Sequence, residues 1–365
     1  MNNFFIDKMS KSAVCLIGDI GGTNVRLSLR KISKDINQPQ EIIDQGKLPT
    51  QKYPSLESAV EEYLSKFKNT EKYPEFAVIG VPGPIKNNEI LGLANIPQWP
   101  KSSGEEFAKK FGMKKFIFLN DFTCNAYGVQ TNLKLNEDYI IINDVPCQEG
   151  GVKGIIGPGS GLGMSFLVKD PSNEFYSIGS CEGGHMDYFS KNKKHFELAE
   201  FTKKLLGQDL LSIERLCSGQ GLIPMYKFLH SIEKDIKRDE EFGKKIDKLN
   251  DLKNVVDVDK INIELVNKGL KEECPLCKKV LELFIEVFAE VSGNIALYCL
   301  PTNGFYLVGG LSIALESMIK NTKIFMEHFI NKDSFQYLLK TFPVYLVKNG
   351  DLGVLGAAEC ARRLI

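Results

Sequence analysis

The chain has 365 residues, and its 46 basic and 46 acidic side chains give a formal net charge of zero. This length is more than one compact core usually serves, so we expect two domains. A zero net charge gives no electrostatic reason to expect a nucleic-acid partner. The sequence contains no apolar run of about 20 residues, so we expect no membrane span.

Apolar runs and helical periodicities in the chain predict an α/β architecture. The predicted strands, in chain order, are 14–19, 25–30, 76–81, 116–119, 154–156, 165–168 and 305–308. Helices are predicted over 55–67, where Ser55 is placed to cap, within 276–300 and over 352–364. In the stretch 231–260, 17 of 30 residues are charged with mixed signs. This composition indicates a solvated helix or a surface insertion.

The nine cysteines are scattered along the chain. Disulfide frameworks are typical of short secreted chains, so we expect reduced thiols and a cytoplasmic protein. Cys274 and Cys277 form a C-x-x-C motif without the second pair that a zinc site requires, which favours a structural role at the start of a helix. No signal-peptide pattern begins the chain, and its last residues, RRLI, are not the peroxisomal signal.

Two glycine-rich turns each lie between two predicted strands. The first, 19–24, reads DIGGTN, and the second, 157–163, reads GPGSGLG. Glycines let a backbone approach a phosphate and direct N–H groups at it, and a hydroxyl adds a donor. The pair therefore predicts a phosphate clamp, with Asp19 holding magnesium, most simply through water. Each turn by itself is equally consistent with a tight connection between strands. Neither the P-loop pattern nor G-x-G-x-x-G occurs.

Polar side chains follow the strand 116–119 and a later glycine pair. Asn120 and Asp121 come directly after the strand, and ligands of α/β sheets bind beyond the carboxyl ends of strands. Alternatively, Asp121 only caps the following helix. Glu182 and His185 flank two glycines whose bend would turn both side chains toward one ligand. The alternative is a structural histidine, and zinc is disfavoured because no second Cys/His pair has suitable spacing.

These residues resemble the bacterial-type ATP-dependent glucokinases of the actin/hexokinase superfamily. The resemblance covers nearly the whole chain and rests on seven ordered motifs: 16–27 (LIGDIGGTNVRL), 118–128 (FLNDFTCNAYG), 157–163 (GPGSGLG), 182–188 (EGGHMDY), 213–222 (IERLCSGQGL), 307–311 (LVGGL) and 353–358 (GVLGAA). It implies an α/β, two-domain actin/hexokinase-like fold with a substrate cleft between the domains. We expect a small α/β domain of 1–131 plus 349–365 and a large α/β domain of 132–348.

The resemblance implies a glucokinase, which transfers the γ-phosphate of ATP to the 6-hydroxyl of glucose in the first step of glycolysis, with magnesium. Asp121 matches the family's catalytic base. The expected sugar ligands are Asn95, Asn120, Asp121, Glu182, His185 and Glu214. The residues expected at ATP are Asp19, Gly21, Gly22, Thr23, Asn24, Gly159, Ser160, Gly161, Gly309 and Gly310. A homodimer follows by family analogy, with glucose and ATP as the small-molecule partners.

Two alternatives remain open from the sequence. The first is a kinase of the same superfamily that acts on mannose, glucosamine or fructose. The second is a sugar-binding regulator without catalysis, which the presence of Asp19, Asp121 and both glycine turns disfavours. The zinc-binding cysteine motif and the DNA-binding extension of the related repressors are also missing from the chain. Ser160 stands where the family usually has threonine, which keeps the hydroxyl.

Overall fold

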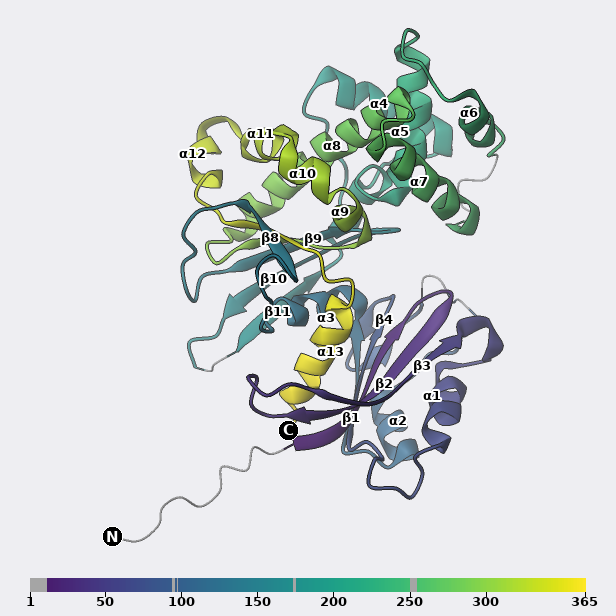
Figure 1. The fold of residues 1–365 in the computed structure, drawn as a ribbon, viewed down its shortest axis with the longest axis vertical. Coiled ribbons are helices and arrows are strands. Elements are labelled where there is room, and N and C mark those ends of the chain that lie inside the picture. The colour runs from purple at the N-terminus through teal and green to yellow at the C-terminus, as the bar shows by residue number, and fades with distance from the viewer. Residues whose placement is uncertain (1–11, 94–95, 97, 173–174, 250–254) are drawn as a thin grey trace. The chain divides into compact units, whose positions relative to one another are not determined.

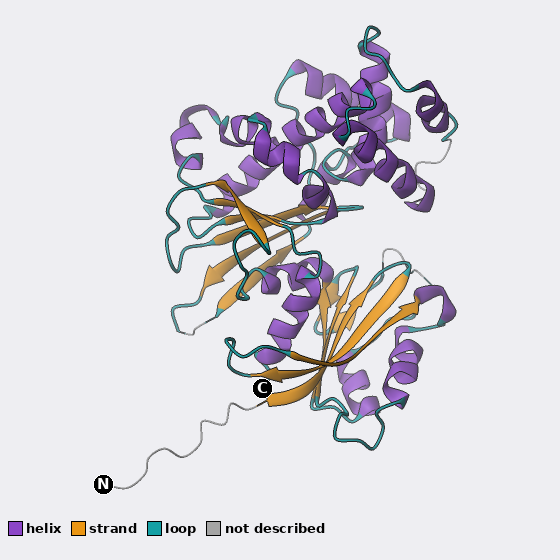
Figure 2. Cartoon of the chain, in the orientation of Figure 1, coloured by secondary structure: helices purple, strands orange, loops and turns teal. Residues whose placement is uncertain are grey.

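The computed structural model describes residues 12–93, 96, 98–172, 175–249 and 255–365. The chain forms two compact units, Met1–Lys134 together with Gly350–Ile365, and Leu135–Asn349 (Figure 1). Each unit combines strands with helices, as Figure 2 shows. Within the described residues no helix has the length and apolar character needed to cross a membrane.

The first unit is built on a five-stranded sheet in the order β3-β2-β1-β4-β7. Its strands are β1 (Ser12–Ile20), β2 (Asn24–Ser33), β3 (Glu41–Pro49), β4 (Phe76–Val81) and β7 (Lys115–Asn120), with a separate short pair of β5 (Ile85–Lys86) and β6 (Glu89–Ile90). Its helices are α1 (Leu56–Ser65), α2 (Gly104–Phe111), α3 (Asp121–Gly128) and α13 (Leu352–Arg362). β1, β4 and β7 run parallel, whereas β2 and β3 are antiparallel additions. The carboxyl ends of β1, β4 and β7 therefore meet at one edge of the sheet.

Alternation along β1 gives this sheet two apolar faces. Leu16 and Ile20 belong to a core that includes side chains of α1 and α2. Cys15 and Ile17 belong to a second core with side chains of α3 and α13. The helices thus cover both faces, which a parallel sheet requires. Ser55 caps α1 as predicted, since its side chain accepts a hydrogen bond from the Ser58 N–H at 3.1 Å.

The second unit contains a six-stranded sheet in the order β11-β10-β9-β12-β13-β8. Its strands are β8 (Tyr139–Asn143), β9 (Lys153–Pro158), β10 (Leu162–Lys169), β11 (Tyr176–Cys181), β12 (Phe305–Leu307) and β13 (Val344–Val347). Its helices are α4 (Lys193–Leu206), α5 (Gly219–Ile232), α6 (Glu240–Asp247), α7 (Val255–Leu270), α8 (Pro275–Cys299), α9 (Gly310–Ala314), α10 (Glu316–Asn321), α11 (Ile324–Ile330) and α12 (Gln336–Leu339). The predicted longest helix is α8, most of whose apolar side chains are buried.

Of two predictions about this unit, the one for 231–260 needs refinement and the one for the C-x-x-C motif is confirmed. The charged stretch 231–260 holds the end of α5, all of α6 and the start of α7. It is not purely solvated, because Phe242 and Ile246 of α6 are buried in the main core. The C-x-x-C motif begins α8, where the Cys274 Sγ accepts the Cys277 N–H at 3.4 Å. All nine cysteines are free thiols.

A buried charged cluster ties α4, α8 and α11 together. The His195 side chain is fully buried, and its Nδ1 lies 3.0 Å from a Glu290 carboxylate oxygen. Its Nε2 lies 3.4 Å from Glu286, and His328 Nδ1 lies 3.0 Å from the other Glu290 oxygen. The Lys332 ammonium donates to the Glu290 backbone carbonyl at 2.8 Å. Each buried charge therefore has partners of opposite sign or a hydrogen bond.

These contacts shift the titration of the cluster. Burial lowers the pKa of His195, but hydrogen bonds to Glu286 and Glu290 outweigh burial and raise the pKa to about 9. Burial raises the pKa of Glu290, but hydrogen bonds to His195 and His328 outweigh it and lower the pKa to about 2. His195 and Glu290 are therefore both charged in the folded protein throughout the range in between.

The His195 cluster predicts a pH-dependent stability. The folded pKa of His195 is raised above its ordinary 6.5. The stability that His195 adds to the folded protein is therefore complete below about pH 6.5 and is lost as pH rises through about 9. The contribution of Glu290 is present above about pH 4.5 and is lost as pH falls toward 2. His195 by itself should lose a contribution on the order of 3 kcal/mol between pH 6.5 and 9.5. Lys332 opposes this loss, because burial lowers its pKa to about 8 and its buried charge is removed over the same range.

Urea denaturation midpoints at pH 6.5 and 9.5 would measure this loss. His195→Gln should lower the midpoint at pH 6.5 and flatten the dependence, because glutamine carries no charge at either pH. His230→Gln, at the half-buried end of α5, is the matched control and should keep the wild-type slope. A wild-type slope retained in His195→Gln would show that other groups cause it.

Candidate functional site

The parallel strands of the first unit gather two acidic side chains at one edge of the sheet. Asp19 in β1 is aligned with Gly80 in β4, and Gly80 is aligned with Leu119 in β7. Asp121 follows β7 directly and is the first residue of α3. Both carboxylates also interact electrostatically with the buried Cys124 thiol, which independently places them in one region. The alignment of these strands thus brings the predicted metal ligand and the predicted base together.

Asn120, and not Asp121, is the cap of α3. The Asn120 Oδ1 accepts the N–H groups of Phe122 and Thr123 at 2.9 and 3.2 Å. Its Nδ2 donates to the Gly83 carbonyl at 3.3 Å. The alternative in which Asp121 caps the helix is therefore wrong. The Asp121 side chain is exposed, and its Oδ1 accepts the Phe122 N–H at 2.8 Å, which fixes the carboxylate in the first helical turn.

The first glycine turn connects β1 and β2 and includes Gly21, Gly22 and Thr23. The Gly21 N–H donates to the carbonyl of Asn24, the first residue of β2, at 2.9 Å. Thr50, which is fully buried, donates its hydroxyl to the Gly21 carbonyl at 2.8 Å and its N–H to the Thr23 carbonyl at 3.0 Å. Thr23 itself is exposed. Sequence reasoning missed Thr50, because it lies 29 residues away and no local pattern marks it.

Asp19 has the surroundings of a cation ligand. Burial raises the pKa of its carboxyl, the opposing Arg26 lowers that pKa, and Asp351 raises it. A desolvated carboxylate with a second acid nearby is stabilised by a divalent cation. The described residues contain no cluster of three or more His, Cys, Asp or Glu side chains that could enclose a metal. This donor set fits magnesium, which proteins typically hold through one or two carboxylates, water and substrate phosphates.

The second glycine turn, of the second unit, includes Gly159, Ser160 and Gly161 and connects β9 with β10. The Gly159 N–H donates to the Gly161 carbonyl at 2.8 Å, and the Gly219 N–H donates to the Gly159 carbonyl at 2.9 Å. The Gln220 Nε2 donates to the Ser160 carbonyl at 3.0 Å. The start of α5 therefore supports the turn. Its residues belong to the motif IERLCSGQGL, whose sequence alone does not indicate this role.

The glycine pair after β12 lies against the same turn. β12 is parallel to β9, so the two strands end at the same edge of the sheet. Gly309 has φ of +90°, and a Cβ there would lie 2.7 Å from the Pro158 carbonyl. Both the backbone conformation and the close approach require glycine at this position. Gly310 is the first residue of α9.

Two of the predicted sugar ligands in the second unit lie together. The His185 Nδ1 is 3.6 Å from a Glu214 carboxylate oxygen, with side chains 64% and 14% exposed. The other Glu214 oxygen would lie 3.0 Å from a Cβ at Gly161, so this carboxylate contacts the second glycine turn. Glu182 is exposed and directly precedes the 3-10 turn Gly183–His185. The predicted ligand Asn95 lies outside the described residues.

Gly80 controls how closely α3 approaches the sheet. A Cβ at Gly80 would lie 2.9 Å from the Cys124 Sγ of α3. We expect Gly80→Ala to lower the free energy of unfolding by about 1–3 kcal/mol, because the methyl group overpacks this contact. Chemical denaturation of Gly80→Ala, Cys124→Ala and the double variant forms the test. The double variant should lose less free energy of unfolding than the two single variants lose together, because Cys124→Ala makes room for the methyl group. Strictly additive losses would contradict the contact.

Comparisons with known proteins identify the family and the fold of the chain. The model of the glucokinase family matches residues 16–364. A glucokinase of Nostoc punctiforme is 30% identical over 357 residues, which cover 96% of this chain and 99% of that protein. The solved glucokinase from an Antarctic psychrotroph superposes with a TM-score of 0.77 at 24% identity, covering 96% of this chain and 99% of the other.

A second similar structure contains ligands. It is the ROK family glucokinase from Streptomyces griseus in complex with glucose and AMPPNP, with a TM-score of 0.59, 17% identity, and coverage of 96% of this chain and 99% of that one. At this identity the likeness shows the actin/hexokinase-like fold. The evidence for the activity is the family match over almost the entire chain. The chain belongs to the glucokinase family, and its reaction is the ATP-dependent phosphorylation of glucose.

Proposed function

We propose that Asp121 is the general base of glucose phosphorylation in this chain. The observation that carries the proposal is its placement: an exposed carboxylate held at the first residue of α3, at the sheet edge where β1 also ends. The amino-terminal end of a helix favours negative charge, as on a carboxylate in the first turn. An ionised, solvent-accessible carboxylate is what a base needs to receive the proton of a sugar hydroxyl.

Glu182, His185 and Glu214 are proposed as ligands of the sugar hydroxyls, together with Asn120, Asp121 and Asn95. Carboxylates accept hydrogen bonds and the imidazole can donate or accept, so these types can satisfy a ring of hydroxyl groups. The contact between His185 and Glu214 supports a shared role for these two side chains. Asn120 contributes through its Nδ2 group, because its Oδ1 is engaged by two backbone N–H groups of α3.

The glycine turns are proposed as the phosphate-binding segments for ATP. They comprise Gly21, Gly22, Thr23 and Asn24 in the first unit, and Gly159, Ser160, Gly161, Gly309 and Gly310 in the second. Their backbones are fixed by Thr50 and by the start of α5, which favours a binding surface that is ordered before the ligand arrives. Asp19 would hold magnesium through water. The bound ion supplies neutralisation of the phosphate charge.

The residues then act in a simple sequence. The 6-hydroxyl oxygen of glucose forms a bond to the γ-phosphorus as the bond from that phosphorus to the β-γ bridging oxygen breaks, and Asp121 receives the hydroxyl proton. The products are glucose 6-phosphate and ADP. Most of the rate enhancement comes from positioning of the two substrates and neutralisation of charge. We further propose that the enzyme acts with magnesium at the first step of glycolysis in the cytoplasm, as a homodimer by family analogy, with glucose preferred over mannose, glucosamine and fructose.

Replacement of Asp121 tests the base. Asp121→Asn should lower kcat by about 10²–10⁴-fold, because general-base catalysis contributes about that factor. The dissociation constant of glucose should stay within a few-fold of wild type, since the amide keeps the size of the side chain. A coupled assay for ADP and calorimetric titration with glucose measure the two quantities. Asp35→Asn, an exposed acid after β2, is the control; wild-type turnover in Asp121→Asn would exclude Asp121 as the base.

Replacement of Asp19 tests the metal role. Asp19→Asn should lower turnover at saturating glucose and shift the dependence on free magnesium to higher concentration, because the amide cannot supply the negative charge. Binding of glucose should change little. Turnover assays over a magnesium series, again beside Asp35→Asn, measure the shift. An unchanged magnesium dependence with reduced glucose affinity would assign Asp19 to the sugar instead.

A further inference from the structure

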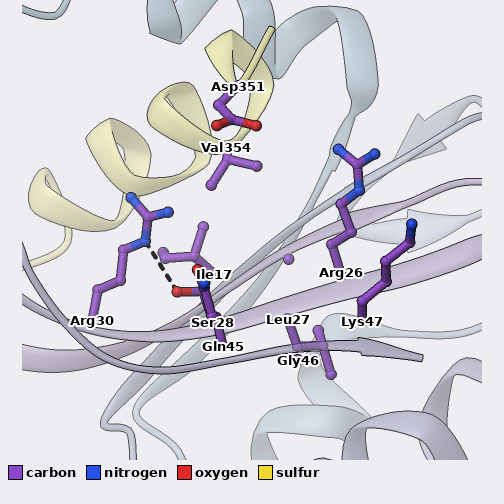
Figure 3. A pocket seen from close by; sticks show the side chains of 11 residues that line it. Ile17, Arg26, Leu27, Ser28, Arg30, Gln45, Gly46, Lys47, Asp351 and Val354 are labelled. Atoms are coloured by element: carbon purple, nitrogen blue, oxygen red, sulfur yellow. Dashed lines mark hydrogen bonds between the residues drawn. The ribbon is translucent and has the colours of Figure 1, made fainter.

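A pocket in the first unit is not used by the residues assigned above to glucose or ATP. It has a cavity volume of about 310 Å³ and is lined by side chains of β1, β2, β3 and α13 (Figure 3). Pockets of about this size and larger hold small ligands in many proteins. Gly18, one of its lining residues, directly precedes Asp19. The pocket is thus next to the first glycine turn without including it.

Strand alternation makes this pocket basic. Along β2, Arg26, Ser28 and Arg30 lie on the face opposite the buried Leu27 and Leu29. Directly opposed residues of paired strands share a face. Lys47 of β3 is opposed to Arg26, and Gln45 is opposed to Ser28. The pattern therefore places two arginines and a lysine on one surface of the sheet, where Figure 3 shows them around the pocket.

The positive charge of this surface is only partly balanced, although Asp19, which does not line the pocket, also interacts with Arg26. Three cations line the pocket, and of the described residues that line it Asp351 is the only acid. Arg30 is half-buried, and its guanidinium donates to two neutral acceptors, Ser28 Oγ at 3.2 Å and Gln40 Oε1 at 3.0 Å. Burial lowers the pKa of Arg30, and the nearby Asp351 opposes that effect. A partly desolvated cation with neutral partners is stabilised by an added anion.

Arg26 and Lys47 are available for such an anion. Within the part of the chain that the structure describes, neither side chain makes a hydrogen bond or a close ion pair. They face each other across β2 and β3, close enough to bind one phosphate group together. Arg30 lies four residues along the strand, roughly 13 Å from Arg26 between Cα atoms. That separation matches a ligand that extends beyond its phosphate.

The other polar side chains of the pocket indicate which groups the rest of the ligand carries. The Asp351 carboxylate accepts hydrogen bonds and repels a second anionic group, so it favours hydroxyl donors. The Gln45 amide both donates and accepts, which also suits hydroxyl groups. We propose that this pocket binds a phosphate group held by Arg26 and Lys47, carried by a sugar phosphate or present as inorganic phosphate.

Binding in this pocket would also affect the reaction through Asp19. Arg26 is directly opposed to Asp19 in the β1–β2 pair and interacts with it electrostatically. A phosphate at Arg26 therefore competes with Asp19 for the same guanidinium. The effect on turnover rests on the metal role proposed for Asp19, whereas binding in the pocket does not depend on it.

Calorimetric titration tests the binding. Glucose 6-phosphate is titrated into the full-length protein saturated with glucose and without nucleotide, so that the sugar ligands of the reaction are already occupied. We expect saturable binding, and Lys47→Met should weaken it about tenfold or more, because a charge-assisted hydrogen bond is lost. Lys31→Met is the matched control: Lys31 is an exposed lysine of the neighbouring strand β2 that does not line the pocket. Arg30→Lys, which keeps the charge but loses the planar fork, provides a second variant.

Each outcome decides the proposal. No binding to the glucose-saturated protein, or binding altered equally by Lys47→Met and Lys31→Met, would overturn it. Inorganic phosphate that binds as tightly as the ester, with the same sensitivity to Lys47→Met, supports a site for free phosphate. Tighter binding of the ester supports a sugar phosphate. The titration is independent of turnover, so failure of Asp121 as the base would leave its result unchanged.

Discussion

The parallel pairing of β1, β4 and β7 is the constraint on which the candidate site of the first unit depends. Parallel strands end at a common edge, so Asp19 in β1 and Asp121 after β7 lie near each other although about 100 residues separate them. Gly80 in the middle strand permits the close approach, because any larger side chain would meet Cys124 of α3. Two carboxylates of different proposed roles are therefore positioned by one backbone arrangement.

The second unit repeats this principle with a different connection. β9 and β12 are parallel, and the glycine segments that follow them lie against each other, with Gly309 in a conformation and a contact that only glycine satisfies. The start of α5 fixes the turn through Gln220 and Gly219. Glu214, four residues before the residue that caps α5, then contacts both His185 and this turn. The proposed phosphate-binding turn and two of the proposed sugar ligands of this unit thus lie in contact with one another.

The alternation of side chains between the two faces of β2 has two consequences. One face supplies Val25, Leu27 and Leu29 to the core, and the other presents Arg26 and Arg30. Because α13 packs within the sheet mainly on β1 and β4, the charged face of β2 is left as a pocket beside the glycine turn. The arginines of the motif GGTNVRLSLR therefore belong to this pocket and not to the glycine turn itself. An ATP-dependent kinase whose product is itself a phosphate ester has such a surface next to its proposed metal ligand.

The sequence by itself determined the α/β class, the motifs of the glucokinase family and the elements with strong local signals, among them α1 with its cap Ser55, the buried strand β4 and the long helix α8. These signals are local, since periodicity and capping involve residues a few positions apart. Only the tertiary structure decided that Asn120 caps α3, that the buried Thr50 fixes the first glycine turn, and that Lys47 joins Arg26 and Arg30. The edge strand β3, mostly exposed and without clear alternation, gave no sequence signal. Such contacts join residues distant in the chain, and their partners are fixed by strand register, which no single segment encodes.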